Sequence, residues 1–288
     1  MKIIACSPFF KENLLARIKA QELSGWVDEI HITEANRTHR NEPKEYFFDR
    51  ALLAQFPKLR YHALDVSRVF RSERRLPPHF VLNPPRASRR IFRKTIAYND
   101  SVLRKMACNV SEFGDEDIII LSDMDEIADA RMADRLLDAV NKYGIVTAWM
   151  HYSFYFFNLF SVKWAGPVNY GYRLFLIKGK RLRQEWKLDA DWLRKQGERG
   201  HLVGAVHCME QFCGYHHSFL GDEDFIRQKT IDFFHSEKTL KSLTSSYIKQ
   251  CLRDKRSMFP GHELRVDNSI PQLRTVEQLR SELSGFFM

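Results

Sequence analysis

The hydrophobic positions in the first half of the chain alternate between a period of two and a period of about 3.6 residues. This pattern is typical of strands that alternate with amphipathic helices. Strands are predicted at Lys2–Cys6, Val27–Thr33, Leu59–Leu64 and Ile118–Leu121, and helices at Glu12–Leu23, Arg90–Val110 and from about Ala128 to Val140. Such an alternation predicts a mostly parallel sheet with helices on both faces.

From residue 145 onward the pattern becomes richer in strands. Strands are predicted at Val146–Phe157 and Tyr172–Ile177, followed by a loop from Leu182 to Gly204. Asp222 then caps a helix that runs to Phe234, and the tail ends in a helix at Val276–Leu283. No segment contains the roughly 18 consecutive apolar residues that would span a bilayer.

The predicted strand Ile118–Leu121 runs directly into the acidic sequence Asp123-Met-Asp125-Glu126. Ligands of open α/β sheets bind beyond the carboxyl ends of the strands. Carboxylates there suit Mg²⁺ or Mn²⁺, which complete their shells with substrate phosphates. The alternative is that Asp123 or Asp125 is the N-cap of the following helix.

Two enzyme chemistries use a strand followed by such an acidic pair. An aspartyl-phosphate phosphatase is one, but its pattern lies near the N-terminus and has Thr or Val soon after the second Asp, where this chain has Glu126. The other is a glycosyltransferase, in which the pair holds the metal on the diphosphate of a nucleotide sugar.

Composition is that of a soluble globular protein. The 288 residues are 44% apolar, and the mean hydropathy is −0.40. The N-terminus is too short and too soon interrupted by Pro8 to be a signal peptide. Five scattered cysteines show no zinc-type spacing, which favours reduced thiols and a cytoplasmic location.

Positive charge is concentrated between Val66 and Lys94, where nine basic residues face a single acid, Glu73. Two pairs of prolines argue against a continuous helix, so an irregular insertion is expected. It is either a solvated loop or a surface that meets anionic lipid or a phosphate-bearing acceptor. No nucleic-acid-binding motif accompanies it.

In chain order, six segments resemble glycosyltransferase family 17, which includes the enzyme that adds the bisecting N-acetylglucosamine to N-glycans. They are Pro8-Phe-Phe-Lys-Glu-Asn-Leu-Leu15, Glu34-Ala-Asn-Arg-Thr-His39 with Pro43 and Lys44, Ser122-Asp-Met-Asp-Glu-Ile127, Trp164 with Gly166, Gly214-Tyr-His-His-Ser218 and Phe234-His-Ser-Glu237. Ala128 and Tyr215 replace the family's usual Pro and Trp. The basic segment 66–94 and the lack of a membrane anchor also depart from the family.

The resemblance implies one GT-A-like domain over residues 1–288. Residues 1–145 would bind the nucleotide sugar, and the strand-rich residues 146–288 would form the acceptor side. The implied activity is an inverting, metal-dependent transfer, with UDP-N-acetylglucosamine as the expected donor and a glycan hydroxyl as the acceptor. The competing hypotheses are a metal-dependent phosphohydrolase and a basic module that binds nucleic acid or a membrane surface.

Site residues follow from the same motifs. Asp123 and Asp125 are predicted to ligate Mn²⁺ or Mg²⁺, with His216 as a further ligand and His217 as its alternative. Asp224 is the favoured catalytic base, ahead of Glu126 and Glu223, and the alternative is that the acids at 222–224 only favour a helix N-terminus.

The remaining candidates concern the donor. Glu34, Thr38 and His39 follow the second strand and are expected at the same sheet edge as Asp123, either binding the nucleotide or, for Glu34, serving as a buried structural carboxylate. Arg173 is a candidate for the diphosphate. Trp164 would stack on a sugar or pack in the core, and His235 would contact the donor or cap a helix.

Overall fold

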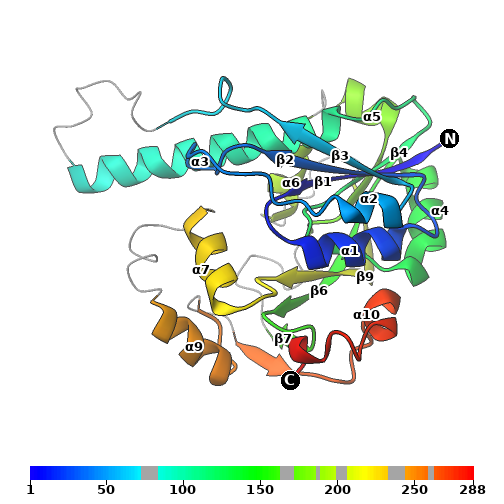
Figure 1. The fold of residues 1–288 in the computed structure, drawn as a ribbon. Coiled ribbons are helices and arrows are strands. Elements are labelled where there is room, and N and C mark those ends of the chain that lie inside the picture. The colour runs from blue at the N-terminus through cyan, green and yellow to red at the C-terminus, as the bar shows by residue number, and fades with distance from the viewer. Residues whose placement is uncertain (73–83, 163–171, 186–188, 199–205, 233–243, 259–262) are drawn as a thin grey trace.

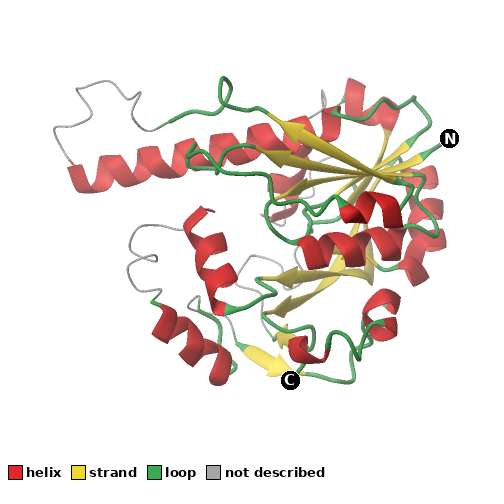
Figure 2. Ribbon diagram, viewed as in Figure 1, coloured by secondary structure: helices red, strands yellow, loops and turns green. Residues whose placement is uncertain are grey.

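A mixed β-sheet forms the central layer of the molecule (Figures 1 and 2). The structure is a computed structural model that describes residues 1–72, 84–162, 172–185, 189–198, 206–232, 244–258 and 263–288. Within these residues, the strands are β1 Ile3–Phe9, β2 Glu29–Ala35, β3 Leu59–Leu64, β4 Ile118–Leu121, β5 Glu126–Ala128, β6 Ile145–Phe154, β7 Leu159–Ser161, β8 Phe175–Lys178, β9 His207–Ser218 and β10 Leu264–Val266.

The order of neighbouring strands is β10-β7-β6-β8-β4-β1-β2-β3, and β9 pairs with both β5 and β6. β1 is parallel to both β2 and β4, and β3 is parallel to β2. β8 is antiparallel to β4 and β6, whereas β9 is parallel to β6 and antiparallel to β5. The carboxyl ends of β1, β2 and β4 therefore meet at one edge of the sheet.

Helices cover both faces of this sheet. Their bounds are α1 Asn13–Leu23, α2 Ala51–Gln55, α3 Pro84–Asn109, α4 Ala133–Tyr143, α5 Gly179–Gln184, α6 Ala190–Glu198, α7 Glu223–Asp232, α9 Ser245–Arg253 and α10 Arg274–Gln278, with 3₁₀ turns at Ala130–Met132 and Ser284–Phe286. Figure 1 shows α3 and α7 on opposite sides of the carboxyl ends of the central strands.

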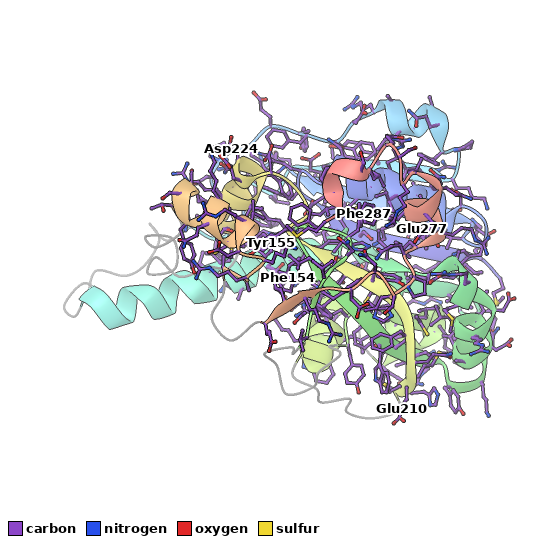
Figure 3. The ribbon with its side chains drawn as sticks, turned by 90° about the horizontal axis from the view of Figure 1, so that it is seen from below. Phe154, Tyr155, Glu210, Asp224, Glu277 and Phe287 are labelled. Carbon is purple, nitrogen blue, oxygen red and sulfur yellow. The ribbon has the colours of Figure 1, made fainter. Side chains whose placement is uncertain are left out.

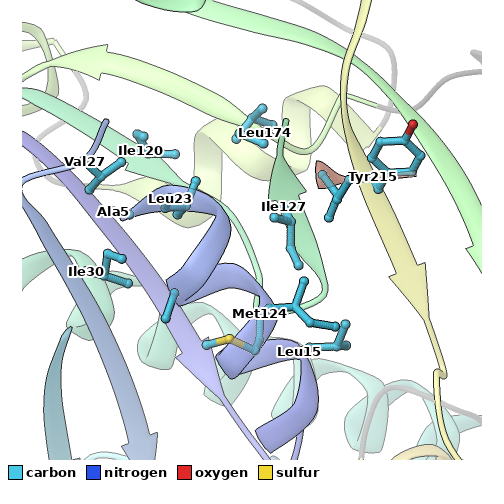
Figure 4. Close-up of a cluster of buried hydrophobic side chains, with 14 of the residues drawn as sticks. Ala5, Leu15, Leu23, Val27, Ile30, Ile120, Met124, Ile127, Leu174 and Tyr215 are labelled. Atoms are coloured by element: carbon cyan, nitrogen blue, oxygen red, sulfur yellow. The ribbon is translucent and has the colours of Figure 1, made fainter. Parts of the chain in front are cut away.

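Alternation along the central strands divides the core between the two faces. On β1, Ala5 packs with α1, α4 and α10, while Ile4 and Cys6 pack with α3, α5 and α6. β4 alternates in the same way, with Ile120 on the first face. Figure 4 shows part of this first cluster, in which Leu15 and Leu23 of α1 lie with Ile120 and Met124. Because apolar residues point to both faces of the sheet, the sequences of β1 and β4 are largely continuous apolar runs.

The mixed, partly parallel sheet and its helical layers confirm the predicted α/β fold class. The helix predicted from Ala128 begins later than expected, at Ala133, because Ala128 pairs with Gly214 in the ladder between β5 and β9. The residue before α4 is Met132, which makes no side-chain cap, and Asp129 caps the short 3₁₀ turn. Asp123 and Asp125 therefore do not cap the helix, and this alternative is wrong.

The basic segment is less irregular than predicted. α3 begins at Pro84, so residues 84–94 are helical, and the N-terminal part of the helix extends past the sheet (Figure 1). Proline is tolerated in the first helical turn, where its missing N–H would have no intrahelical partner. Residues 73–83 lie outside the described residues, and lipid or acceptor binding by 66–94 stays a prediction. None of the described helices combines the length and apolarity needed to cross a membrane.

Three further elements differ from the sequence prediction. The loop predicted at Leu182–Gly204 contains α6, because Leu193 is buried in the core beneath α3. The strand β6 ends at Phe154, and the next residue, Tyr155, has a positive φ of 64° that stops the extended backbone. Near the C-terminus, α10 spans Arg274–Gln278 and not Val276–Leu283. All five cysteines are free.

Candidate active site

Three buried side chains that could together hold a metal ion, hereafter the metal-ligating group, lie at the carboxyl end of β4. The turn after β4 leads into β5, and the antiparallel ladder with β9 places Glu126 opposite His216. One ligand atom each from Asp125, Glu126 and His216 lies within 4.8 Å of the other two. His216 Nε2 is 3.5 Å from Asp125 Oδ2, and His216 Nδ1 is 3.9 Å from Glu126 Oε1.

Two atoms of this group stand out by their lack of a hydrogen-bond partner in the described part of the chain. Glu126 Oε1 and His216 Nδ1 are buried, and neither has a hydrogen-bond partner within the described residues. Buried polar atoms normally find partners, so such a pair marks a position for a ligand. Two carboxylates and one imidazole suit a divalent ion such as Mn²⁺. The residues present therefore fit the predicted cation, although in a different set from the one the sequence predicted.

Asp123, the first acid of the motif, is held by two arginines. Arg104 donates to both carboxylate oxygens, at 3.1 and 2.9 Å, and Arg194 Nη2 donates to Oδ2 at 3.0 Å. Burial alone would raise the pKa of the Asp123 carboxyl, but the two guanidinium charges outweigh it and hold this pKa well below its usual range. Asp123 therefore holds the side chains of Arg104 and Arg194 at the site and does not belong to the group of three possible metal ligands.

Arg194 also connects Asp123 to the metal-ligating group. Its Nη1 donates to Glu126 Oε2, and this oxygen accepts the backbone N–H of Asp123 at 2.7 Å. Glu126 is completely buried. Asp123, Glu126 and Arg194 therefore form one hydrogen-bonded unit, and Oε1 of Glu126 has no hydrogen-bond partner among the described residues.

Asp125 is paired with a lysine from the opposite side of the cavity. Lys229 of α7 lies 2.8 Å from Asp125 Oδ2 and 2.9 Å from Glu12 Oε1. Burial raises the pKa of the Asp125 carboxyl, but Lys229 and then His216 outweigh this effect and lower it. Burial likewise lowers the pKa of Lys229, and its two carboxylate partners raise it above the usual value.

A second lysine supports the acidic turn from beneath. Lys19 of α1 is 1% exposed and donates to Ser122 Oγ at 2.8 Å, to the Asp123 carbonyl at 2.7 Å and to the Glu126 carbonyl at 2.9 Å. Burial lowers the pKa of Lys19 to about 8, against the opposing charges of Glu126 and Asp123. The backbone of the turn is therefore fixed to α1.

The site opens into a cavity of about 300 Å³. Asp123, Asp125 and His216 line it, together with residues from β1, β2, α3, α6 and α7. Seven lining residues carry positive charge, namely Arg37, Lys44, Arg104, Arg173, Arg194, Lys195 and Lys229, against four carboxylates, Glu12, Asp100, Asp123 and Asp125. The excess of cations favours an anionic ligand.

The structure separates the predicted donor-binding residues into two groups. Thr38, His39 and Arg173 line the cavity. Glu34 does not, because its carboxylate is fully buried and accepts hydrogen bonds from Lys44, the Tyr61 hydroxyl and the N–H groups of residues 47 and 48. Glu34 is a structural carboxylate that holds the loop after β2. Trp164 and His235 lie outside the described residues.

The favoured catalytic base, Asp224, is not among the residues that line the cavity. Asp224 is exposed near the N-terminus of α7, where Figure 3 places it at the outer surface. Lys229 is five positions further along the helix and lies on a different face, which points into the cavity. Asp222 accepts the N–H of Phe225, so the alternative that these acids serve the helix N-terminus fits the structure.

His217, the alternative metal ligand, faces the core. Its side chain is completely buried, Nδ1 lies 2.8 Å from the Ser153 hydroxyl, and burial lowers its pKa to about 3. Its backbone N–H donates to the Asp125 carbonyl at 2.8 Å. His217 therefore supports the metal-ligating turn from behind, and His216 is the histidine at the cavity.

Several residues of the site gave no signal in the sequence. Arg104, Arg194, Lys229 and Lys19 come from four different helices and carry no motif. Asp100 and Arg104 are four positions apart on α3 and form an ion pair, which the helical spacing of the segment could have indicated. The partners of Asp123 and Asp125 depend on contacts between distant segments.

Comparisons with known proteins give a distant likeness only. No family model matches the chain, and no curated protein matches it. Among solved structures, TarS 1–349 of S. aureus has a TM-score of 0.42 at 10% identity, covering 88% of this chain and 72% of that one. The galactosyltransferase LgtC, in complex with donor and acceptor sugar analogues, has a TM-score of 0.37 at 10% identity, covering 100% and 97%.

A third solved structure, the bifunctional IspDF of Campylobacter jejuni, has a TM-score of 0.36 at 11% identity, covering 81% of this chain and 54% of that one. At such scores the likeness does not establish an activity. The fold class rests on the sheet topology, and the chemistry rests on the residues at the edge of β4.

Proposed function

We propose that the chain is a glycosyltransferase that moves a sugar from a nucleotide-sugar donor to an acceptor hydroxyl, assisted by a divalent cation. One observation carries the proposal. A buried group formed by Asp125, Glu126 and His216, with two unpaired ligand atoms, borders a cavity lined by an excess of cations. A metal ligand set and a cationic wall in one place fit a donor that carries a diphosphate.

The charges on the cavity wall match this donor. Arg104 and Arg194 lie beside Asp123, and Arg173 and Lys195 line the same cavity. Guanidinium groups bind phosphate oxygens in pairs of hydrogen bonds. We infer that this side of the cavity binds the diphosphate, and that Thr38 and His39 line the part that receives the nucleoside or the sugar.

The transfer requires one bond to form as another breaks. The acceptor oxygen attacks the anomeric carbon, the bond from that carbon to the diphosphate oxygen breaks, and the acceptor proton passes to a base. A cation held by Asp125, Glu126 and His216 would act as a Lewis acid on the leaving diphosphate. Arg104 and Arg194 add fixed positive charge in a site that needs little reorganisation during the reaction.

We propose Asp100 as the base. It lines the cavity, its side chain is 22% exposed, and it shares Arg104 with Asp123. Within the described residues, Asp100 pairs with Arg104, whereas Asp123 pairs with both Arg104 and Arg194, and Asp125 belongs to the metal-ligating group. Glu12 accepts from two backbone N–H groups and pairs with Lys229, and Glu126 belongs to the metal-ligating group. Asp224, which the sequence favoured, does not line the cavity.

The particular sugar follows from the resemblance to glycosyltransferase family 17. That resemblance supports UDP-N-acetylglucosamine as the donor, inversion at the anomeric carbon and a glycan acceptor. The segments that carry it at residues 8–15, 122–127 and 214–218 meet at the cavity in the structure, since Pro8, Asp125 and His216 all line it. Membership of that family remains part of the proposal.

The test is a transfer assay with UDP-N-acetylglucosamine, Mn²⁺ and a panel of glycan acceptors. We expect release of UDP with formation of a glycosylated product, and loss of both in Asp125→Asn. Asp138→Asn, an exposed position on α4, is the matched control and should be fully active. Release of inorganic phosphate from phosphoesters without transfer would favour a phosphohydrolase, and full activity in Asp125→Asn would remove the proposed site.

A further inference from the structure

Lys229 forms an ion pair with Asp125, a carboxylate that would also ligate the divalent cation. Its ammonium lies 2.8 Å from Asp125 Oδ2, and His216 Nε2 lies 3.5 Å from the same oxygen. The Lys229 side chain is 8% exposed and reaches this point from α7, far from the acidic turn in the sequence. A protein cation and the metal-ligating group therefore converge on one oxygen atom.

We propose that Lys229 is a tethered competitor of the divalent cation at Asp125, so that the cation binds well only together with a diphosphate. This inference rests on the cation site of the proposed function. A divalent ion at Asp125, Glu126 and His216 must approach an ammonium that already neutralises Asp125, and two like charges so close repel each other. The cation alone should therefore bind weakly.

The diphosphate changes this balance. Its negative charges can pair with the ammonium as Asp125 turns to the metal, so that the cation and the nucleotide each favour the other's binding. Glu12 keeps Lys229 near the cavity during this exchange, because its Oε1 lies 2.9 Å from the ammonium while its Oε2 is held by the N–H groups of Phe10 and Lys11.

The anchor of Lys229 is firm enough for this role. Ile226, on the turn before it in α7, is completely buried, and the Thr230 hydroxyl donates to the Ile226 carbonyl at 2.7 Å. The ammonium also lies 5.5 Å from the centre of the Phe219 ring. Only the ammonium end of the Lys229 side chain has to move when a cation binds. Because α7 carries Lys229, this helix connects cation binding at Asp125 with the wall of the cavity.

The experiment measures Mn²⁺ binding by calorimetry, without any turnover. In the wild-type protein, we expect weak binding of Mn²⁺ alone and at least tenfold tighter binding in the presence of UDP. In Lys229→Met, Mn²⁺ alone should bind at least tenfold tighter than in the wild type, and the gain from UDP should shrink. Lys249→Met is the control. This lysine of α9 is exposed, pairs with Glu223 and does not line the cavity, so Mn²⁺ affinity should change by less than threefold.

Unchanged or weaker Mn²⁺ binding in a folded Lys229→Met protein would overturn the proposal, as would an equal gain in Lys249→Met. Lys229→Gln serves if the methionine variant does not fold, since it retains a polar group without the charge. Glu12→Gln gives an independent test of the competition between Lys229 and the cation. It removes the second partner of Lys229, ties the ammonium more closely to Asp125 and should weaken Mn²⁺ binding.

The outcomes separate the two proposals. Tighter Mn²⁺ binding in Lys229→Met without sugar transfer by the wild type would retain the competition and remove the glycosyltransferase. Sugar transfer by the wild type, with no effect of Lys229→Met on Mn²⁺ affinity, would retain the glycosyltransferase and remove the competition.

Discussion

Glu126 and His216 are paired across the antiparallel ladder of β5 and β9, with Glu126 Oε1 3.9 Å from His216 Nδ1. Both atoms are buried and have no hydrogen-bond partner in the part of the chain that the structure describes. A ladder position sets this distance by backbone hydrogen bonds, so neither side chain depends on a mobile loop for its place. The pair would therefore give the proposed cation site a rigid base, to which Asp125 would add the third ligand.

The first prediction concerns the base. Asp100→Asn should reduce the turnover number at least a hundredfold with little change in donor binding, because an amide cannot accept the acceptor's proton. Asp224→Asn should keep near-normal turnover, since Asp224 is exposed and outside the cavity lining. Steady-state kinetics with UDP-N-acetylglucosamine compare the two variants. The opposite order of activities would restore the assignment that the sequence favoured.

The second prediction concerns Arg194, which is 6% exposed and contacts both Asp123 and Glu126. Arg194→Met should lower the free energy of unfolding by about 3 kcal/mol, because the fully buried Glu126 and the partly buried Asp123 lose their shared cation. Urea unfolding measures this loss. Arg265→Met, which removes an exposed ion pair with Asp267, should leave the urea midpoint almost unchanged. Equal midpoints for both variants would show that Arg194 contributes no more than a surface arginine.

The third prediction concerns Lys19 beneath the acidic turn. Lys19→Met should lower the free energy of unfolding by about 3 kcal/mol, because three buried oxygen acceptors lose their donor. It should also weaken Mn²⁺ binding in the presence of UDP, since the turn that carries Asp125 loses its anchor. Thermal unfolding and calorimetry check the two effects. Lys2→Met, at an exposed ion pair with Glu29, is the control that should change neither.

The fourth prediction concerns acid stability. Burial lowers the pKa of His151 to about 4, below its usual value of 6.5. Between these two pH values the unfolded chain binds more protons at this site than the folded chain, so stability must fall as the pH drops from 6.5 towards 4. The full contribution is up to about 3 kcal/mol.

His151→Phe removes this titration while keeping an aromatic ring, which can stack on Phe212 as the imidazole does at 3.9 Å. The free energy of unfolding of the variant should therefore decline less steeply than that of the wild type over this pH range. Urea unfolding at pH 7, 5.5 and 4.5 measures the slope. Parallel slopes for the two proteins would show that His151 does not titrate differently on unfolding.

Much of the fold could be predicted from the order of apolar and polar residues. The periodicity correctly placed β1, β2, β3, β4 and the helix α1. Burial of one or both faces of an element requires apolar residues at fixed intervals, and these intervals can be read from the local sequence. The boundaries that failed depended on partners. Ala128 is a strand residue only because Gly214 of β9 lies beside it, and α6 packs against α3 from a segment that reads as a loop.

The sequence by itself determined that Asp123, Asp125 and Glu126 follow a buried strand, since a short apolar run ending in acids has few other places in an α/β sheet. Only the tertiary structure decided which of these acids pairs with arginines and which belong to the metal-ligating group. Asp123 lies with two arginines, while Asp125 and Glu126 lie with His216. The physical reason is that a buried carboxylate takes its role from the charges around it, and those charges come from α3, α6, α7 and β9, which only folding brings together.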